Sequence, residues 1–384
     1  MQHNPIPVTY VADAETLANC IAGLTQASSI AFDLEFDSHH YTYGFNLCLL
    51  QMASSTHCYL VDPKAGIDIS PVFRVLENPD IHKVAHCSSE DLRLLHSLQC
   101  YPVNLADTEL YAKLLNYERT SLGAMLQQLF DVELDKKMQK VNWAIRPLHA
   151  DQLDYAARDV LYLLQMEEEL IKQGTDKGLL PFFEEENMLL ETTIHQTASR
   201  DNFLKKKDML YLSPYRQYVL NGMLRYRDDL AREQNKPAHY IIGEETIRDI
   251  VFGAINETDL KYIKNMHPVL KTKEGQGLLY KQLKQLHQEA TSQELSGKKS
   301  NPYPAVNFQA EKARKDQLKA DIFAPIQQEI AAIFGEHAMR FIFSTSAVNS
   351  ILDEQLTIEG VKPAYRKKLV QDTAAKLGVD ISRF

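Results

Sequence analysis

The first residues able to do chemistry are two carboxylates, Asp33 and Glu35, in the segment Ile30-Ala31-Phe32-Asp33-Leu34-Glu35-Phe36. They alternate with apolar residues, so the two-residue period of a β-strand places both carboxylates on one face, about 7 Å apart at roughly 3.3 Å per residue. Such a pair repels itself unless a cation neutralises it. The alternative is an edge strand with a solvated acidic face. A metal-binding site is favoured only if further carboxylates lie on the same face.

A third carboxylate, Asp91, follows a short predicted strand, Lys83–His86, at the start of a helix opened by Ser88. The unpaired amides of a first helical turn favour acidic residues for structural reasons alone. The same position, however, is the C-terminal edge of a strand, where α/β sheets collect their ligands. Asp91 is therefore a candidate ligand with a structural alternative.

A phenol and a fourth carboxylate, Tyr155 and Asp159, lie four residues apart in a predicted helix. This spacing puts them side by side on one helical face, while Leu153, Ala156 and Val160 pack inward. The pair could hold a metal ion and orient a water molecule together. An amphipathic helix with a partly buried tyrosine is the alternative.

The elements that must position these residues belong to an N-terminal α/β region, the front of the chain, which is followed by a helical C-terminal region. Strands are expected at Ile30–Phe36, Leu47–Met52 and His57–Val61 as a three-strand meander, then at Lys83–His86 and Val103–Leu105. Helices are expected to begin at Ser88 and near Thr108, and to cover Ser121–Phe130, Ala150–Lys172, Leu180–Thr193, Glu244–Phe252, Lys312–Phe334, Phe341–Leu352 and Lys362–Leu377. No strand is expected after residue 193.

Composition excludes several other classes of protein. A chain of 384 residues predicts two or three domains, and 45% hydrophobic with 24% charged residues is typical of a globular protein rather than a disordered one. No apolar run is long enough to span a membrane and no signal peptide is evident, so a cytoplasmic protein without a membrane partner is expected. The five cysteines form no C-x-x-C pair, and no phosphate-binding G-x-x-x-x-G-K-[ST] loop occurs.

The net charge of −9 is unevenly distributed along the chain. Residues 1–180 carry −11, whereas residues 201–290 carry +3 and residues 291–384 carry +2. The mildly basic C-terminal half is compatible with phosphate contacts, although a solvated surface without a binding role is the simpler interpretation.

The ordered set of D-x-E, a later aspartate and Y-x-x-x-D resembles the tyrosine-bearing branch of the DEDD 3′-5′ exonuclease superfamily. The segments Leu134-Asp135-Lys136, Trp143–Leu148 and Tyr155–Val160 resemble the ribonuclease D family within it. Residues 225–231 with Asn235-Lys236-Pro237 resemble a helicase-and-ribonuclease-D C-terminal (HRDC) domain. Leu34 replaces a small polar residue of the relatives, on the side of the strand away from the carboxylates.

This resemblance implies an α/β, ribonuclease H-like mixed-sheet exonuclease domain followed by two small all-α HRDC-like helical bundles. The implied domains are an exonuclease domain at 1–175, a helical connector at 176–205, an HRDC-like domain at 206–290, a linker at 291–304 and a diverged HRDC-like domain at 305–384.

The resemblance also implies a site and a cofactor. Two divalent cations, Mg²⁺ or Mn²⁺, would be held by the carboxylates Asp33, Glu35, Asp91 and Asp159. Asp33 would bridge both ions, with Glu35 and Asp159 on the nucleophile side and Asp91 on the other. Tyr155 would orient the attacking water, since a phenol of ordinary pKa near 10 is a poor base at neutral pH.

The implied activity is 3′-to-5′ exoribonuclease, which trims RNA with a single-stranded 3′ end, including transfer-RNA precursors, and releases nucleoside 5′-monophosphates. Lys205-Lys206-Lys207 and Arg366-Lys367-Lys368 are candidates for RNA contact. Two alternatives remain open: a 3′-5′ exonuclease acting on DNA, and a catalytically inactive nucleic-acid-binding protein.

Overall fold

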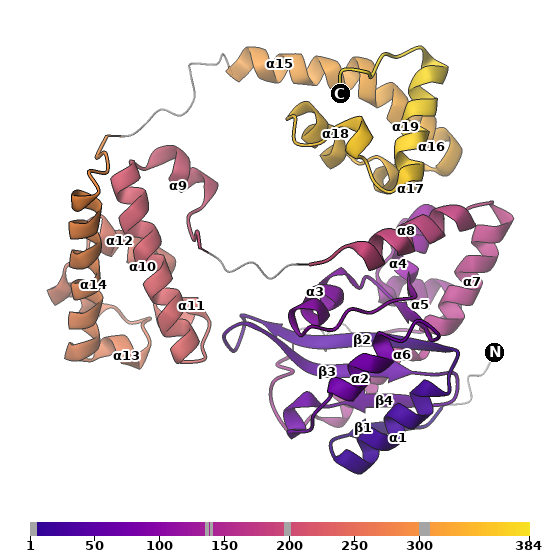
Figure 1. Ribbon diagram of the computed structural model, residues 1–384, viewed down its shortest axis with the longest axis horizontal. Helices are drawn as coiled ribbons and strands as arrows, with labels where there is room; N and C mark the ends of the chain where they lie inside the picture. The colour runs from indigo at the N-terminus through magenta and orange to yellow at the C-terminus, as the bar shows by residue number, and fades with distance from the viewer. Residues whose placement is uncertain (1–5, 135–137, 139–140, 196–200, 299–307) are drawn as a thin grey trace. The chain divides into compact units, whose positions relative to one another are not determined.

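The computed structural model describes residues 6–134, 138, 141–195, 201–298 and 308–384 (Figure 1). They divide into two compact units. Unit 1 comprises Met1–Glu35, Leu47–Gln196 and Asn307–Phe384, and unit 2 comprises Phe36–Asn46 and Thr197–Val306.

The front of the chain forms a six-stranded mixed sheet in the order β1-β4-β3-β2-β5-β6. The strands are β1 (Val8–Val11), β2 (Ser29–Ser38), β3 (Phe45–Ala53), β4 (Cys58–Val61), β5 (His82–Ala85) and β6 (Leu105–Asp107). β1 runs parallel to β4, β3 antiparallel to β4, and β2, β5 and β6 run parallel to one another. The predicted meander is therefore present, and β2 lies inside the sheet rather than at its edge.

Helices surround this sheet in unit 1. They are α1 (Ala14–Thr25), the short η1 (Pro63–Ala65), α2 (Ser70–Leu76), α3 (Ser89–Ser97), α4 (Thr108–Leu114), α5 (Leu122–Phe130), α6 (Ala150–Leu161), α7 (Leu163–Asp176) and α8 (Leu180–Thr192). α6 packs against β4, α7 against β5 and α8 against β6. β2, α3 and α6 together hold the residues singled out above.

Several local predictions differ from the structure. The expected helix Phe341–Leu352, for example, is interrupted at Phe343-Ser344. β1 was not predicted, because a four-residue strand with Thr9 and Tyr10 gives too short a pattern and is fixed by its pairing with β4. The expected helix Ala150–Lys172 is two helices, interrupted at Tyr162. β6 begins at Leu105, two residues later than expected.

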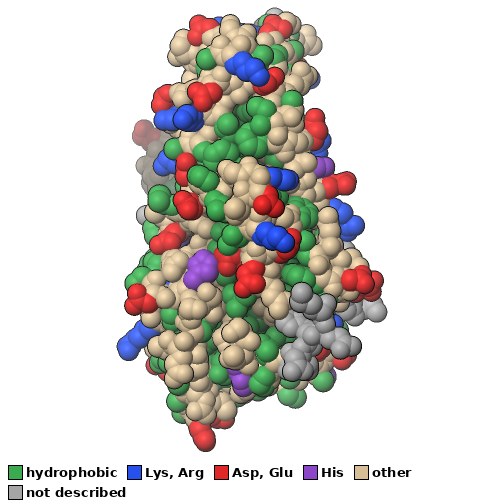
Figure 2. Space-filling view, turned by 90° about the vertical axis from the view of Figure 1, so that its right-hand side faces the viewer, with side chains coloured by type: hydrophobic (Ala, Val, Ile, Leu, Met, Phe, Trp, Pro, Cys, Tyr) green, Lys and Arg blue, Asp and Glu red, His purple; other side chains and the backbone are tan. Residues whose placement is uncertain are grey.

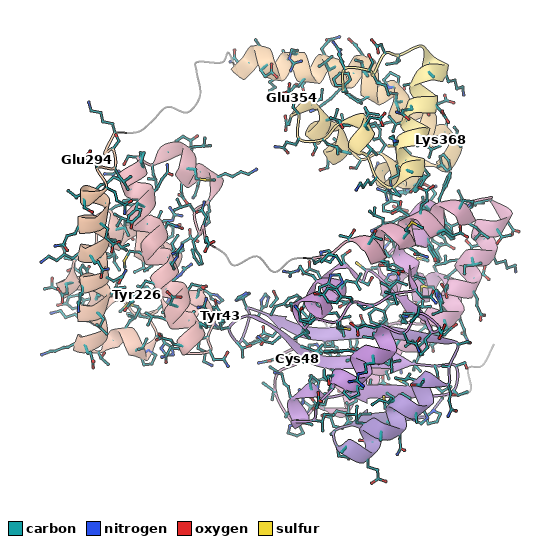
Figure 3. All side chains as sticks on the ribbon, in the orientation of Figure 1. Tyr43, Cys48, Tyr226, Glu294, Glu354 and Lys368 are labelled. Carbon is teal, nitrogen blue, oxygen red and sulfur yellow. The ribbon has the colours of Figure 1, made fainter. Side chains whose placement is uncertain are left out.

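Unit 2 is helical around its own apolar core. Its helices are α9 (Lys206–Tyr211), α10 (Pro214–Glu233), α11 (Ala238–Ile241), α12 (Glu244–Val251), η3 (Glu257–Tyr262), α13 (Pro268–Lys271) and α14 (Lys273–Ser292). The Tyr43 hydroxyl, labelled in Figure 3, donates a 2.6 Å hydrogen bond to Asp228 of α10. Among the described residues after 193, the strand-like pairing consists of one isolated bridge between Ile242 and Met266.

The last helices of the chain belong to unit 1. They are α15 (Phe308–Leu318), the π-helical η4 (Lys319–Phe323), α16 (Ala324–Phe334), α17 (Glu336–Ile342), α18 (Thr345–Leu352), the short η5 (Ile358–Gly360) and α19 (Ala364–Leu377). Their buried residues, such as Phe323, Ile330 and Phe343, form one continuous hydrophobic cluster with Tyr111 and Phe183 of the front domain. Residues 308–384 and the front domain thus share a core.

Polar contacts fix this shared interface. The buried Glu186 of α8 accepts hydrogen bonds from the Tyr365 hydroxyl (2.5 Å) and from Arg366, whose Nη2 lies 2.6 Å from Glu186 Oε1. Asn116 Oδ1 accepts from the backbone amides of His337 and Ala338, at 2.8 and 3.0 Å, and so caps the start of α17. Arg366 therefore serves the interface rather than a free basic surface.

Across the described ranges, we find no helix that combines the length and the apolar character required to cross a membrane.

We expect Glu186→Ala to lower the free energy of unfolding by about 3 kcal/mol, because Arg366, whose side chain is 16% exposed, loses its counter-charge. The melting temperature should fall by about 6 to 12 °C. The matched control is Glu336→Ala, which removes an exposed partner of Arg340 and should change stability by less than about 1 kcal/mol. Calorimetric melting of both variants checks this, and equal melting temperatures would show that the interface does not depend on the ion pair.

Candidate active site

Asp33 and Glu35 project from β2 on the side opposite to Phe32 and Leu34, which are buried. Ala31, two residues before Asp33 on the same side of the strand, belongs to the hydrophobic cluster that contains Tyr155 and Val160 of α6. Both carboxylates retain partial exposure. The strand pleat thus directs the acidic pair towards the side covered by α6.

Asp91 lies in the first turn of α3 and is 6% exposed. The short strand β5 ends at Ala85, and the backbone turns through Cys87, which has a φ of 60°, before the helix begins. The parallel pairing of β5 with β2 brings this turn to the same end of the sheet as Asp33 and Glu35.

Tyr155 and Asp159 lie on the buried face of α6 and are 8% and 3% exposed. At the start of this helix, Gln152 Oε1 accepts a 3.0 Å hydrogen bond from the backbone amide of His149. Tyr155 and Asp159 lie side by side on this face, as the four-residue spacing predicts, and Tyr155 counteracts part of the rise in the pKa of Asp159. The Trp143 ring packs beside Tyr155, with 6.2 Å between ring centroids.

The four carboxylates lie close enough to act on one another electrostatically. Burial raises the pKa of Asp33 to about 7 and, with the charge of Asp33 added, that of Asp159 to about 9. Burial and the charges of Asp33, Asp159 and Asp91 raise the pKa of Glu35 well above its ordinary value. The pKa of Asp91 is raised well above its ordinary value by burial first and by Asp33 second. The structure therefore brings together all four predicted carboxylates and Tyr155.

This group of side chains fits hard divalent cations. Its donors are all carboxylate oxygens, the type preferred by Mg²⁺ and Mn²⁺. Asp159 Oδ1 is buried without a hydrogen-bond partner among the described residues, which is costly unless another group occupies it. Across the part of the chain that the structure describes, no three acidic, histidine or cysteine side chains are already gathered around one ion position. The fit thus rests on donor chemistry and electrostatics.

A cleft of about 260 Å³ opens beside Tyr155. Its lining residues are Glu133, Leu134, Met138, Asp151, Asp154, Tyr155 and Arg158. A larger cleft of about 860 Å³ is lined neither by Tyr155 nor by any of the four carboxylates, so we do not assign it as the active site. Lys136, which carries part of the family resemblance, lies outside the described residues.

Sequence reasoning missed Asp62, which anchors the segment leading into α6. Asp62 is buried and accepts hydrogen bonds from Arg146 Nε (2.5 Å) and Nη2 (2.6 Å). Arg146 Nη2 also donates to the carbonyl of Cys48 on β3, labelled in Figure 3, and Nη1 donates to the carbonyl of Trp143. The Trp143–Leu148 motif drew attention to Arg146. Its partner Asp62 lies 84 residues earlier, where no local sequence pattern indicates the pairing.

Comparison with known proteins gives a consistent result. A family model described as 3′-5′ exonuclease matches residues 8–175. The chain is 30% identical to the ribonuclease D of Zymomonas mobilis, over 69% of this chain and 68% of that protein. It is 32% identical to the ribonuclease D of Haemophilus influenzae, over 63% and 62% of the two chains.

Solved structures agree on the fold. The crystal structure of Escherichia coli RNase D, described as an exoribonuclease involved in structured RNA processing, superposes with a TM-score of 0.70 at 22% identity, covering 96% of this chain and 99% of that one. The catalytic core of RRP6 from Trypanosoma brucei gives a TM-score of 0.64 at 27% identity, over 77% and 82% of the two chains.

We expect the metal-free protein to lose stability as pH rises between about 5 and 9. In the folded state Asp33 and Asp159 keep protons that the unfolded chain has released, because their folded-state pKa values are raised. Since the folded state then binds more protons, the free energy of unfolding falls with rising pH. Thermal melting in EDTA at several pH values checks this. Asp159→Asn should flatten the slope relative to the unaltered protein, and an unchanged slope would contradict the assigned repulsion.

Proposed function

The chain belongs to the ribonuclease D family and is a 3′-5′ exoribonuclease, and from this premise we propose that it removes nucleotides from single-stranded RNA 3′ ends by hydrolysis with two divalent cations. The observation that carries the proposal is the convergence of four mutually repelling carboxylates from β2, α3 and α6 beside a tyrosine hydroxyl. Such a group is costly to fold unless it binds positive charge.

Asp33, Glu35, Asp91 and Asp159 would hold the cations as Mg²⁺ or Mn²⁺. When bound, two such cations supply Lewis acidity, which lowers the pKa of a coordinated water and neutralises charge on the leaving oxygen. Tyr155, which neighbours Asp159 on α6, would orient the attacking water.

The reaction is a hydrolysis at the last phosphodiester. The water oxygen bonds to phosphorus, the bond from phosphorus to the 3′ oxygen of the preceding nucleotide breaks, and that oxygen takes up a proton. The products are a nucleoside 5′-monophosphate and an RNA one nucleotide shorter. We propose transfer-RNA precursors as substrates, supported by the description of the E. coli relative as acting in structured RNA processing.

The contacts that hold RNA outside the catalytic site are proposed to involve residues 206–290. Lys206 and Lys207 are exposed there, while Lys205 pairs with Glu244 at 2.8 Å. On the face shown in Figure 2, which is the right-hand side of Figure 1, Lys and Arg side chains are interspersed with Asp and Glu side chains. That face is therefore not a uniformly basic surface.

We also propose that the protein acts in the cytoplasm. Its five cysteines are free, with Cys20, Cys48, Cys58 and Cys100 buried, which is compatible with a reducing compartment.

A 5′-labelled duplex RNA with a single-stranded 3′ tail tests the proposal. With Mg²⁺ or Mn²⁺ the labelled RNA should shorten in single-nucleotide steps, and nucleoside 5′-monophosphates should accumulate. EDTA should stop the shortening and the accumulation. A matched DNA substrate distinguishes the runner-up activity, since faster degradation of DNA would favour it. Asp33→Asn is the control and should reduce the rate by several orders of magnitude. If it retained more than a tenth of the rate, a loss under about 1.4 kcal/mol of barrier, its role as a ligand would be wrong.

We expect Tyr155→Phe to slow the chemical step by about 10- to 1,000-fold, because it removes one hydroxyl that positions the water and leaves all four carboxylates in place. Metal affinity and RNA affinity should stay within about twofold of wild type. Single-turnover cleavage at saturating Mg²⁺ measures the effect. A wild-type rate would mean that this tyrosine only packs against Trp143.

A further inference from the structure

Asp107, the last residue of β6, is a buried carboxylate whose two oxygens are both engaged by the protein. Oδ1 accepts from the backbone amides of Cys87 and Glu109, each at 2.9 Å. Oδ2 accepts from the Ser88 amide at 2.8 Å and from the Ser88 hydroxyl at 3.0 Å. With four donors on two oxygens, Asp107 has little capacity left to bind a metal ion.

These contacts join the beginnings of two helices. Asp107 is the N-cap of α4, through the amide of Glu109. It also binds the turn that precedes α3, although Ser88, rather than Asp107, occupies the N-cap position of that helix. One side chain therefore fixes two helix starts that lie about 20 residues apart in the sequence.

The turn before α3 needs an external restraint. Cys87 has a φ of 60°, a left-handed conformation that costs a residue with a side chain about 1 kcal/mol or more. The Ser88 side chain makes no capping hydrogen bond to α3, and its hydroxyl donates to Asp107 instead. Without Asp107 the amides of Cys87 and Ser88 would lose their acceptor at a place where Ser88 is fully buried.

The hydrogen bonds of Asp107 to the Cys87-Ser88 turn also affect the position of Asp91. The Ser88 carbonyl accepts a 2.8 Å hydrogen bond from the Leu92 amide and so begins the hydrogen-bond ladder of α3. Asp91 is the third residue of that helix and is buried, so its direction follows from the position of Ser88. Asp107 and Asp91 are also close enough to interact through their charges.

We propose that Asp107 is a positioning residue that holds Asp91 in the orientation required to bind a divalent cation. The inference rests on the proposed metal-dependent function and adds to it a residue that touches neither metal nor substrate. Asp107 acts through the Cys87-Ser88 turn, as groups behind metal ligands do when they fix a ligand's direction.

The test is Asp107→Asn, which keeps the size of the side chain and replaces one accepting oxygen with a donor. Titration of the RNA-free protein with Mn²⁺, followed by electron paramagnetic resonance, should show an affinity about 10- to 100-fold weaker than wild type. Hydrogen exchange at the Cys87 and Ser88 amides should accelerate. RNA hydrolysis should recover partly when the Mn²⁺ concentration is raised, which a general loss of folded protein would not produce.

Asp208→Asn is the matched control. Asp208 is also buried, accepts from the Lys205 amide at 2.9 Å at the start of α9, and pairs with Arg248, but it lies in unit 2. Its loss should lower stability and leave Mn²⁺ affinity unchanged. Ser88→Ala, which removes only the hydroxyl bond to Asp107, should weaken Mn²⁺ binding less than Asp107→Asn and supplies the test if the latter does not fold.

The outcomes separate the two proposals. Wild-type Mn²⁺ affinity in folded Asp107→Asn, or in Ser88→Ala if the first variant does not fold, would overturn the positioning role and leave the metal site intact. Absence of Mn²⁺ binding by the unaltered protein would overturn the metal site and, with it, this inference.

Discussion

Repulsion among four carboxylates in a poorly solvated space is the constraint on which the rest of this structure depends. Asp33, Glu35, Asp91 and Asp159 each have a raised pKa, for which burial is the largest cause. A cluster like this opposes folding, so the surrounding elements must hold it against its own charge. The arrangement is unfavourable without a ligand, and the proposed binding of cations would offset its repulsion.

The scaffold meets this constraint by fixing the four carboxylates from three separate elements, with Asp33 and Glu35 both on β2. β2 lies inside the sheet between β3 and β5, α3 starts from a turn bound to the end of β6, and α6 packs on β4. Arg146 ties the segment before α6 to Asp62 and to the carbonyl of Cys48. Because the supports differ, a disturbance of Asp91 or Asp159 need not displace the two carboxylates of β2.

The sequence predicted what depends on local periodicity and left out what depends on distant partners. The alternation around Asp33 and the spacing of Tyr155 and Asp159 follow from strand and helix geometry, so both could be derived from a few residues. Asp62 and Asp107 could not, because their partners lie 84 and about 20 residues away. The packing of residues 308–384 against α4 and α8 was missed for the same reason, since Asn116 and His337 are 221 residues apart.

That shared core has a consequence for biosynthesis. The apolar surface around Tyr111 and Phe183 leaves the ribosome first, and its covering residues, including Phe323 and Phe343, are made well over a hundred residues later. During translation the front domain therefore carries an exposed apolar face for the time needed to synthesise well over a hundred further residues. A nascent chain interrupted before the final helices would keep that face uncovered, which makes chaperone binding or degradation its expected fate.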